Sequence, residues 1–252
     1  VPQAVLDLAD ASGDNAASRS DEPYRRALSG IYARLDATFR GIAGDSPPRP
    51  ARLHGDAYAT PEAFRRDLVT IASALASAGE GTLASGGALG RLIRTVETFG
   101  FHLATLDLRQ NSDVHERVVG ELLRNAAVEA DYAGLSEDAR VALLCSELGN
   151  NRPLVGAASE LREESTHELA IIHAAAQAHE TFGSAAITTY IISKTTSLSD
   201  LLEVYILLKE AGLYRISSDG TPHAPIMVVP LFETIGDLEA APAIMSAFFA
   251  LP

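Results

Sequence analysis

Three short apolar segments in the second half of the chain constrain its fold most. They cover residues 102–108, 185–192 and 226–232, and each is followed by polar residues and then a helical pattern. Segment 185–192 is rich in β-branched residues, which is typical of a buried strand. Strands that alternate with helices predict parallel β/α units. Because three strands cannot close a barrel of eight, this part is either a small open sheet or an arc of a larger barrel.

Capping residues mark the helix starts in this half of the chain. Ser112–Asp113, Ser136 and Ser199–Asp200 each precede apolar residues at helical spacing. Two further helices are predicted at about 161–182 and 237–249.

The first half of the chain indicates helices alone. An apolar stripe at helical spacing predicts the first of them, and it comprises Tyr24, Leu28, Ile31, Leu35 and Phe39. Thr60–Pro61 marks another helix start. The Gly-rich segment 79–87 matches no common phosphate-binding motif and is predicted to be a loop. We therefore expect a helical section at 1–99 and a section of parallel β/α units at 100–252, in a fold that is mainly α.

Charge and apolar content exclude several classes of protein. The net charge is −13, and no cluster of Lys and Arg is dense enough to neutralise nucleic-acid phosphates. No apolar run reaches the length of a membrane span, and no signal peptide opens the chain. The single cysteine, Cys145, lies in an apolar helical stretch. It indicates a buried, inert thiol and a reducing, cytoplasmic compartment.

Both ends of the sequence suggest that it is part of a longer protein. It begins at Val1 without an initiator Met and finishes in the apolar run 248–252, where a natural terminus would more often be polar. Proteolytic processing and trimming to the ordered part are the alternatives.

Polar side chains stand where the three predicted strands finish. These residues are Arg109 and Gln110, Ser193 and Lys194, and Glu233. In parallel β/α folds the carboxyl ends of the strands carry the chemistry. A guanidinium suits a phosphate or carboxylate, and a lone carboxylate suits Mg²⁺. The pattern predicts a metal-dependent enzyme acting on a small anion. In the structural alternative, Arg109 pairs with Asp107 or a helix C-terminus and Glu233 caps the following helix.

The histidines give weaker signals. His167, His173 and His179 are six residues apart on one predicted helix, which is not a ligand spacing, so they are predicted to lie on the surface. Position 171 is Ile171, so the zinc-protease pattern that His167 would begin is absent. His115 falls in a helix first turn, and no Ser/His/Asp set has support.

Four segments together resemble the phosphoenolpyruvate carboxylase family, in the order that family has them. Leu-Asp-Leu-Arg-Gln at 106–110 and Pro-Leu-Phe-Glu-Thr at 230–234 resemble two of its motifs. Tyr-Ile-Ile-Ser at 190–193 is similar to its intervening strand, and Asp-Glu-Pro-Tyr-Arg at 21–25 to a stretch of its helical part. The matched region covers most of the chain.

The resemblance implies a helical enzyme built around an eight-stranded TIM-type β/α barrel, of which this chain holds a helical section and about three strands. It implies a carbon–carbon lyase that uses Mg²⁺ or Mn²⁺ to join bicarbonate to phosphoenolpyruvate, giving oxaloacetate and phosphate through carboxyphosphate and an enolate. By motif, Glu233 is the metal ligand and Arg109 binds substrate phosphate, with Gln110, Ser193 and Lys194 as further substrate-binding candidates. The intact family member is expected to be a cytoplasmic homotetramer.

Other parts of the family's machinery find no match in this sequence. The catalytic histidine of a Thr-Ala-His-Pro motif, a second metal carboxylate in a Tyr-Ser-Asp segment and an Arg-rich mobile loop are all missing. We therefore expect no catalytic residue within this chain and no activity from it alone. Lys194 stands where many members would have Met, and its effect on anion binding is left open.

Two other functions remain open on the sequence. One is a non-catalytic α-helical scaffold or interaction domain, and the other is a different metal-dependent barrel enzyme acting on pyruvate-like enolates. An open arc of strands leaves unpaired edges and half-covered apolar faces, so this chain is expected to self-associate. A monomeric mass by light scattering would argue against that expectation.

Overall fold

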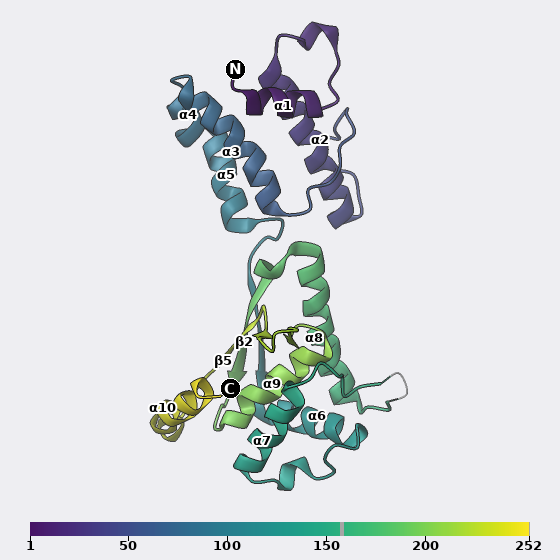
Figure 1. The fold of residues 1–252 in the computed structure, drawn as a ribbon, viewed down its shortest axis with the longest axis vertical. Helices are drawn as coiled ribbons and strands as arrows, with labels where there is room; N and C mark the ends of the chain where they lie inside the picture. Colours follow the sequence, from purple (N-terminus) through teal and green to yellow (C-terminus); the bar gives the residue numbers. More distant parts are fainter. Residues whose placement is uncertain (157–158, 252) are drawn as a thin grey trace. The chain divides into compact units, whose positions relative to one another are not determined.

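The computed structural model describes residues 1–156 and 159–251 and divides into two compact units (Figure 1). Residues 1–104 form the first, here called the helical unit, and residues 105–252 form the second, here called the α/β unit. Within the described residues, no helix has both the length and the apolar character that crossing a membrane would require.

The helical unit packs its helices around one apolar core. Its helices are α1 (Gln3–Ala11), α2 (Pro23–Ala43), α3 (Pro61–Ser77), α4 (Gly81–Gly86) and α5 (Ala88–Phe99), with a 3₁₀ turn at Ala17–Arg19. The core is built from Ile31 of α2, Phe64, Leu68 and Ile71 of α3, and Val96 of α5.

In this unit the predicted cap of α3 is present and one loop prediction is wrong. The Thr60 side chain accepts a hydrogen bond from the Ala63 N–H, as its position before Pro61 predicts. The loop predicted at 79–87 is wrong over α4, because Ala84 is buried and its packing offsets the cost of the flanking glycines.

The crossing of α1 and α2 depends on Gly30. A Cβ at Gly30 would lie 2.7 Å from the Cβ and 2.8 Å from the Cα of Ser12, at the end of α1. We expect Gly30→Ala to lower the free energy of unfolding by about 1–3 kcal/mol, because the backbone must move apart. Gly41→Ala is the matched control on α2, with open space around its Cβ, and should be neutral or slightly stabilising. Urea unfolding of both variants measures the difference, and equal effects would contradict the prediction.

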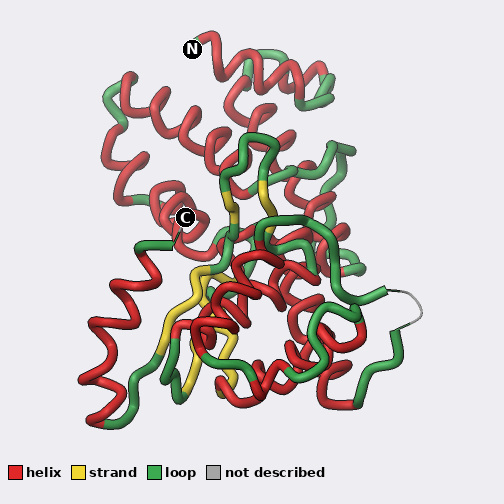
Figure 2. Tube along the Cα trace, turned by 60° about the horizontal axis from the view of Figure 1, so that its bottom comes forward, coloured by secondary structure: helices red, strands yellow, loops and turns green. Residues whose placement is uncertain are grey.

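The α/β unit has a three-stranded parallel sheet in the order β1-β2-β5. Figure 2 draws the strands in yellow. The strands are β1 (Leu106–Asn111), β2 (Ile187–Ser193) and β5 (Met227–Pro230). The helices are α6 (Ser112–Asn125), α7 (Glu137–Leu148), α8 (Glu163–Phe182), α9 (Leu198–Glu210) and α10 (Ile235–Phe249), with 3₁₀ turns at Tyr132–Gly134 and Ser184–Ala186. A small antiparallel hairpin pairs β3 (Arg215–Ile216) with β4 (Pro222–His223).

All three predicted strands exist, but their bounds differ. The first begins at Leu106 rather than at residue 102, because it pairs with β2 only from there. Ser136 caps α7 as predicted. The cap of α9 is Ser197, which forms a capping box with Asp200, and not the predicted Ser199–Asp200.

The two faces of the sheet have different environments. On one face, Tyr190, Ile192 and Val228 are buried in the core that α6–α9 share, so we call it the covered face. On the other face, Ile191 and Val229 are only partly buried and Met227 is 63% exposed. No described helix covers this open face as α6–α9 cover the other.

Candidate functional site

The carboxyl ends of β1, β2 and β5 meet at one edge of the sheet and bring four of the predicted residues to it. Arg109 comes from β1, Ser193 and Lys194 from the end of β2, and Glu233 from the turn after β5. We call this group the strand-end site.

Arg109 and Ser193 are linked by a direct hydrogen bond. The Arg109 Nε–H donates to Ser193 Oγ at 2.8 Å. The Arg109 side chain is 59% exposed, whereas Ser193 is only 5% exposed. The guanidinium is thus tethered at one nitrogen while most of it faces solvent, and a tethered cation of this kind can bind an anion.

Arg109 and Glu233 lie close but make no tight pair. Arg109 Nη2 is 3.7 Å from Glu233 Oε1, beyond hydrogen-bond distance. Among the described residues Arg109 has its ion pair with Glu233, not with Asp107. The capping box of α10 is made by Thr234 and Asp237, so the Glu233 carboxylate does not cap that helix. Both groups therefore remain available to ligands.

Gln110 lies away from the strand-end site, whereas Lys194 is part of it with its side chain exposed. Gln110 lies on the covered face, where its Nε2 donates to Glu168 Oε1 of α8 at 2.9 Å, so its side chain is not brought beside Arg109. Lys194 adopts a left-handed backbone conformation, with φ of 59°. Its carbonyl accepts a hydrogen bond from Ser112 Oγ at 2.9 Å, and the residue is exposed.

Glu233 is the residue of this site that could hold a cation. Within the described part of the chain, no three His, Cys, Asp or Glu side chains gather into a metal-binding group. A single half-exposed carboxylate still fits Mg²⁺, which takes one or two protein carboxylates and fills its other positions with substrate and water.

A buried histidine beneath the sheet was not expected from the sequence. His115 is fully buried, and its Nε2 lies 2.9 Å from the Tyr190 hydroxyl. Burial lowers the pKa of His115 from 6.5 to about 4. The signal for it was the helical spacing of His115 with Val118 and Val119, which are also buried.

The histidines of α8 and the single cysteine differ in how far they are buried. His167 and His173 are exposed, as predicted, whereas His179 is partly buried and its Nε2 lies 2.7 Å from the Ile187 carbonyl. Cys145 is partly buried, and burial raises the pKa of its thiol, which disfavours the reactive thiolate.

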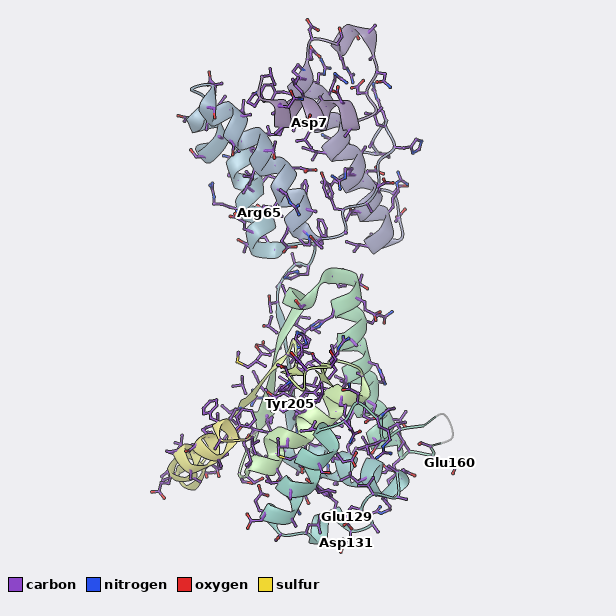
Figure 3. All side chains as sticks on the ribbon, viewed as in Figure 1. Asp7, Arg65, Glu129, Asp131, Glu160 and Tyr205 are labelled. Atoms are coloured by element: carbon purple, nitrogen blue, oxygen red, sulfur yellow. The ribbon has the colours of Figure 1, made fainter. Side chains whose placement is uncertain are left out.

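A cavity of about 670 Å³ lies elsewhere in the α/β unit, between α7, α9, the β3–β4 hairpin and the end of α10. Cys145 and the aromatic rings of Tyr205 (labelled in Figure 3), Tyr214 and Phe248 line it. Among the described residues that line it none is charged, so it lacks the charged donor that binds a small anion best. The strand-end site is the better candidate for anion chemistry.

Comparison with known proteins identifies the family. The model of the family "Phosphoenolpyruvate carboxylase" matches residues 3–252. Proteins named phosphoenolpyruvate carboxylase from Azoarcus sp. (strain BH72) and Aromatoleum aromaticum are each 50% identical over 99% of this chain. One from Mycobacterium leprae is 49% identical over 94% of it. The chain spans 27% of the length of the first two relatives and 25% of the third. It belongs to the phosphoenolpyruvate carboxylase family.

Proposed function

We propose that this chain is part of an enzyme that joins bicarbonate to phosphoenolpyruvate, giving oxaloacetate and phosphate. The observation that carries the proposal is the meeting of Arg109 and Glu233 at the carboxyl ends of β1 and β5, the two parallel strands that flank β2. Family membership over nearly the whole chain supports it independently.

The sheet is proposed to be an arc of an eight-stranded β/α barrel. Its all-parallel order, the helices on one face and the open opposite face support this, since a barrel interior is lined by the uncovered side of its strands. The full-length protein is proposed to be a cytoplasmic homotetramer, as the family resemblance implies. Self-association of the present chain through its open sheet stays a prediction.

Arg109 is proposed to bind the phosphate of phosphoenolpyruvate. A guanidinium forms two parallel hydrogen bonds to phosphate oxygens and holds the group while it changes partner. In the proposed reaction bicarbonate attacks that phosphoryl group, giving carboxyphosphate and the enolate of pyruvate. Carbon dioxide is then released from carboxyphosphate, leaving phosphate, and the enolate carbon captures it. Arg109 orients the phosphoryl group throughout, and the exposed Lys194, directly after β2, adds positive charge at the same edge of the sheet.

Glu233 is proposed to hold Mg²⁺ or Mn²⁺. When bound, the cation would supply Lewis-acid stabilisation of the negative charge that develops on the substrate. Arg109 lies close enough to Glu233 that a substrate held by the guanidinium would also adjoin the carboxylate.

Metal binding by this chain alone is expected to be weak. One carboxylate provides few ligands, so a Mn²⁺ titration followed by electron paramagnetic resonance should give a dissociation constant in the millimolar range. Micromolar or tighter binding that Glu233→Gln abolishes would contradict this expectation. Glu239→Gln, on α10 and exposed, is the matched control for the loss of one carboxylate.

Assay of the full-length protein tests the proposed function. Oxaloacetate formation from phosphoenolpyruvate and bicarbonate should require divalent cation and should be absent with this chain alone. A different product from a pyruvate-like enolate would favour another metal-dependent barrel enzyme. No turnover of any such substrate by the full-length protein would favour a non-catalytic scaffold.

A further inference from the structure

We propose that Ser193 is a positioning residue that holds the Arg109 guanidinium apart from Glu233 and does not itself contact substrate. The proposal rests on the proposed anion-binding function of Arg109. Ser193 Oγ accepts the Arg109 Nε–H at 2.8 Å, and Ser193 is 5% exposed. A hydroxyl so deeply placed reaches the guanidinium, while the rest of the Arg109 side chain remains open to solvent.

The acceptor is fixed because its backbone is anchored on both sides. Ser193 stands opposite Asn111 of β1 in the sheet register. The next carbonyl, that of Lys194, accepts the Ser112 hydroxyl at 2.9 Å, which ties the end of β2 to the start of α6. Thr195 N–H donates to the Leu231 carbonyl at 3.3 Å, which ties the same turn to the chain leaving β5.

The hydrogen bond from Arg109 Nε to Ser193 determines which nitrogens of the guanidinium can bind an anion. With Nε bonded to Ser193, the two terminal nitrogens of Arg109 stay available, and two parallel hydrogen bonds are what a phosphate accepts best. Arg109 has one ion-pair partner among the described residues, Glu233, whose Oε1 lies 3.7 Å from Arg109 Nη2.

Loss of the tether would change the partner of Arg109. Without the Ser193 hydroxyl, the guanidinium can swing toward Glu233 and close the gap to a direct ion pair. Such a pair would use both the cation and the carboxylate, leaving less of either for an anion or a metal ion. The buried hydroxyl therefore keeps the Arg109 guanidinium and the Glu233 carboxylate near each other without a direct hydrogen bond, so that both can bind other groups.

Nuclear magnetic resonance of the ¹⁵N-labelled chain tests this, with inorganic phosphate as the probe. In the wild type, the Arg109 Nε–H should exchange slowly with water and shift on titration with phosphate. Ser193→Ala should accelerate that exchange and weaken phosphate binding about tenfold, as expected for one lost hydrogen bond to a charged group. Ser193→Thr keeps a hydroxyl and should stay within about twofold of the wild type.

Two further variants separate positioning from general loss of structure. Thr195→Val removes a buried hydroxyl of the same turn, one that bonds the Ile192 carbonyl and not Arg109, so phosphate affinity should be unchanged. Ser193→Ala combined with Glu233→Gln should recover part of the lost affinity, because the competing carboxylate is gone. If Ser193→Ala is unfolded, Ser193→Cys replaces it, with a weaker acceptor and a smaller loss.

The outcomes distinguish the two proposals. Unchanged phosphate affinity in folded Ser193→Ala, or an equal loss in Thr195→Val, would overturn the positioning role. No shift of the wild-type Arg109 signal with phosphate would count against the proposed function of Arg109. In that case the Nε–H exchange rate of Ser193→Ala would still report whether Ser193 holds the guanidinium.

Discussion

Replacing Arg109 with Gln in the full-length protein is expected to lower kcat/KM for phosphoenolpyruvate in the proposed reaction by about 10²–10³-fold, as for other preorganised donors to a reacting group. The substitution removes the half-exposed cation that is proposed to bind the substrate phosphate. Arg109→Lys keeps the charge but not the planar pair of donors, so it should recover only part of the activity. Steady-state kinetics at varied phosphoenolpyruvate and saturating bicarbonate and Mg²⁺ measures both.

The matched control is Arg117→Gln. Arg117 lies on α6, is half exposed, and bonds Asp113 and Glu164 rather than any residue of the strand-end site. Surface ion pairs of this kind contribute little, so kcat/KM should stay within about twofold of the wild type. Activity of Arg109→Gln equal to that of the control would remove Arg109 from the proposed mechanism.

Protonation of His115 is expected to destabilise the α/β unit by up to about 3 kcal/mol. Burial lowers the pKa of His115 from 6.5 to about 4, with the charge of Asp113 opposing it. A group whose folded pKa is depressed contributes stability that is present above the unfolded pKa and is lost as pH falls through the folded pKa. The loss should therefore develop between about pH 6.5 and pH 4. Chemical unfolding across this range measures it.

A variant comparison isolates the contribution of His115 from that of other groups. His115→Gln can still hydrogen-bond the Tyr190 hydroxyl but does not titrate, so its unfolding free energy should fall less on acidification. His173→Gln, at an exposed position of α8, should keep the wild-type pH dependence. Parallel pH profiles for wild type and His115→Gln would show that His115 is not the group responsible.

Buried Glu203 changes stability with pH in the opposite direction to His115. Its pKa is raised well above 4.5, mainly by burial, and the Tyr132 hydroxyl donates to its Oε1 at 2.8 Å. A group with a raised folded pKa contributes stability below its unfolded pKa that is lost as pH rises. The wild-type profile alone would therefore mix the two effects, which is why the variant comparison is needed.

Local signals predicted most elements of this fold. Thr60 and Ser136 were recognisable as helix caps because their side chains accept hydrogen bonds from backbone N–H groups three residues later. The β3–β4 hairpin has strands of two residues, too short for a periodic pattern. It is held by hydrogen bonds between Asn151 and Ile216, which lie far apart in the sequence and which no local pattern reveals.

The strand-end residues could be found from sequence because parallel strands bring their carboxyl ends to one edge. The face of the sheet on which each side chain lies depends on where the strand ends. Since β1 continues to Asn111, Gln110 lies within the strand, and the alternation of side chains turns it away from Arg109. A strand ending at residue 108, as the apolar pattern predicts, leaves both residues in a loop with no such constraint. Glu203 could not be found at all, since its burial depends on how Tyr132 packs against α9.

The left-handed backbone at Lys194 has a consequence for how this edge can vary among related proteins. A residue other than glycine pays some strain to adopt φ of 59°, and here the carbonyl of the strained residue serves as an acceptor for Ser112. Because the main chain of Lys194 makes this hydrogen bond, its side chain is not needed to hold the end of β2 in place. Substitution of Lys194 can therefore change the charge at this edge without disturbing the fold. Replacement by glycine would also relieve the backbone strain.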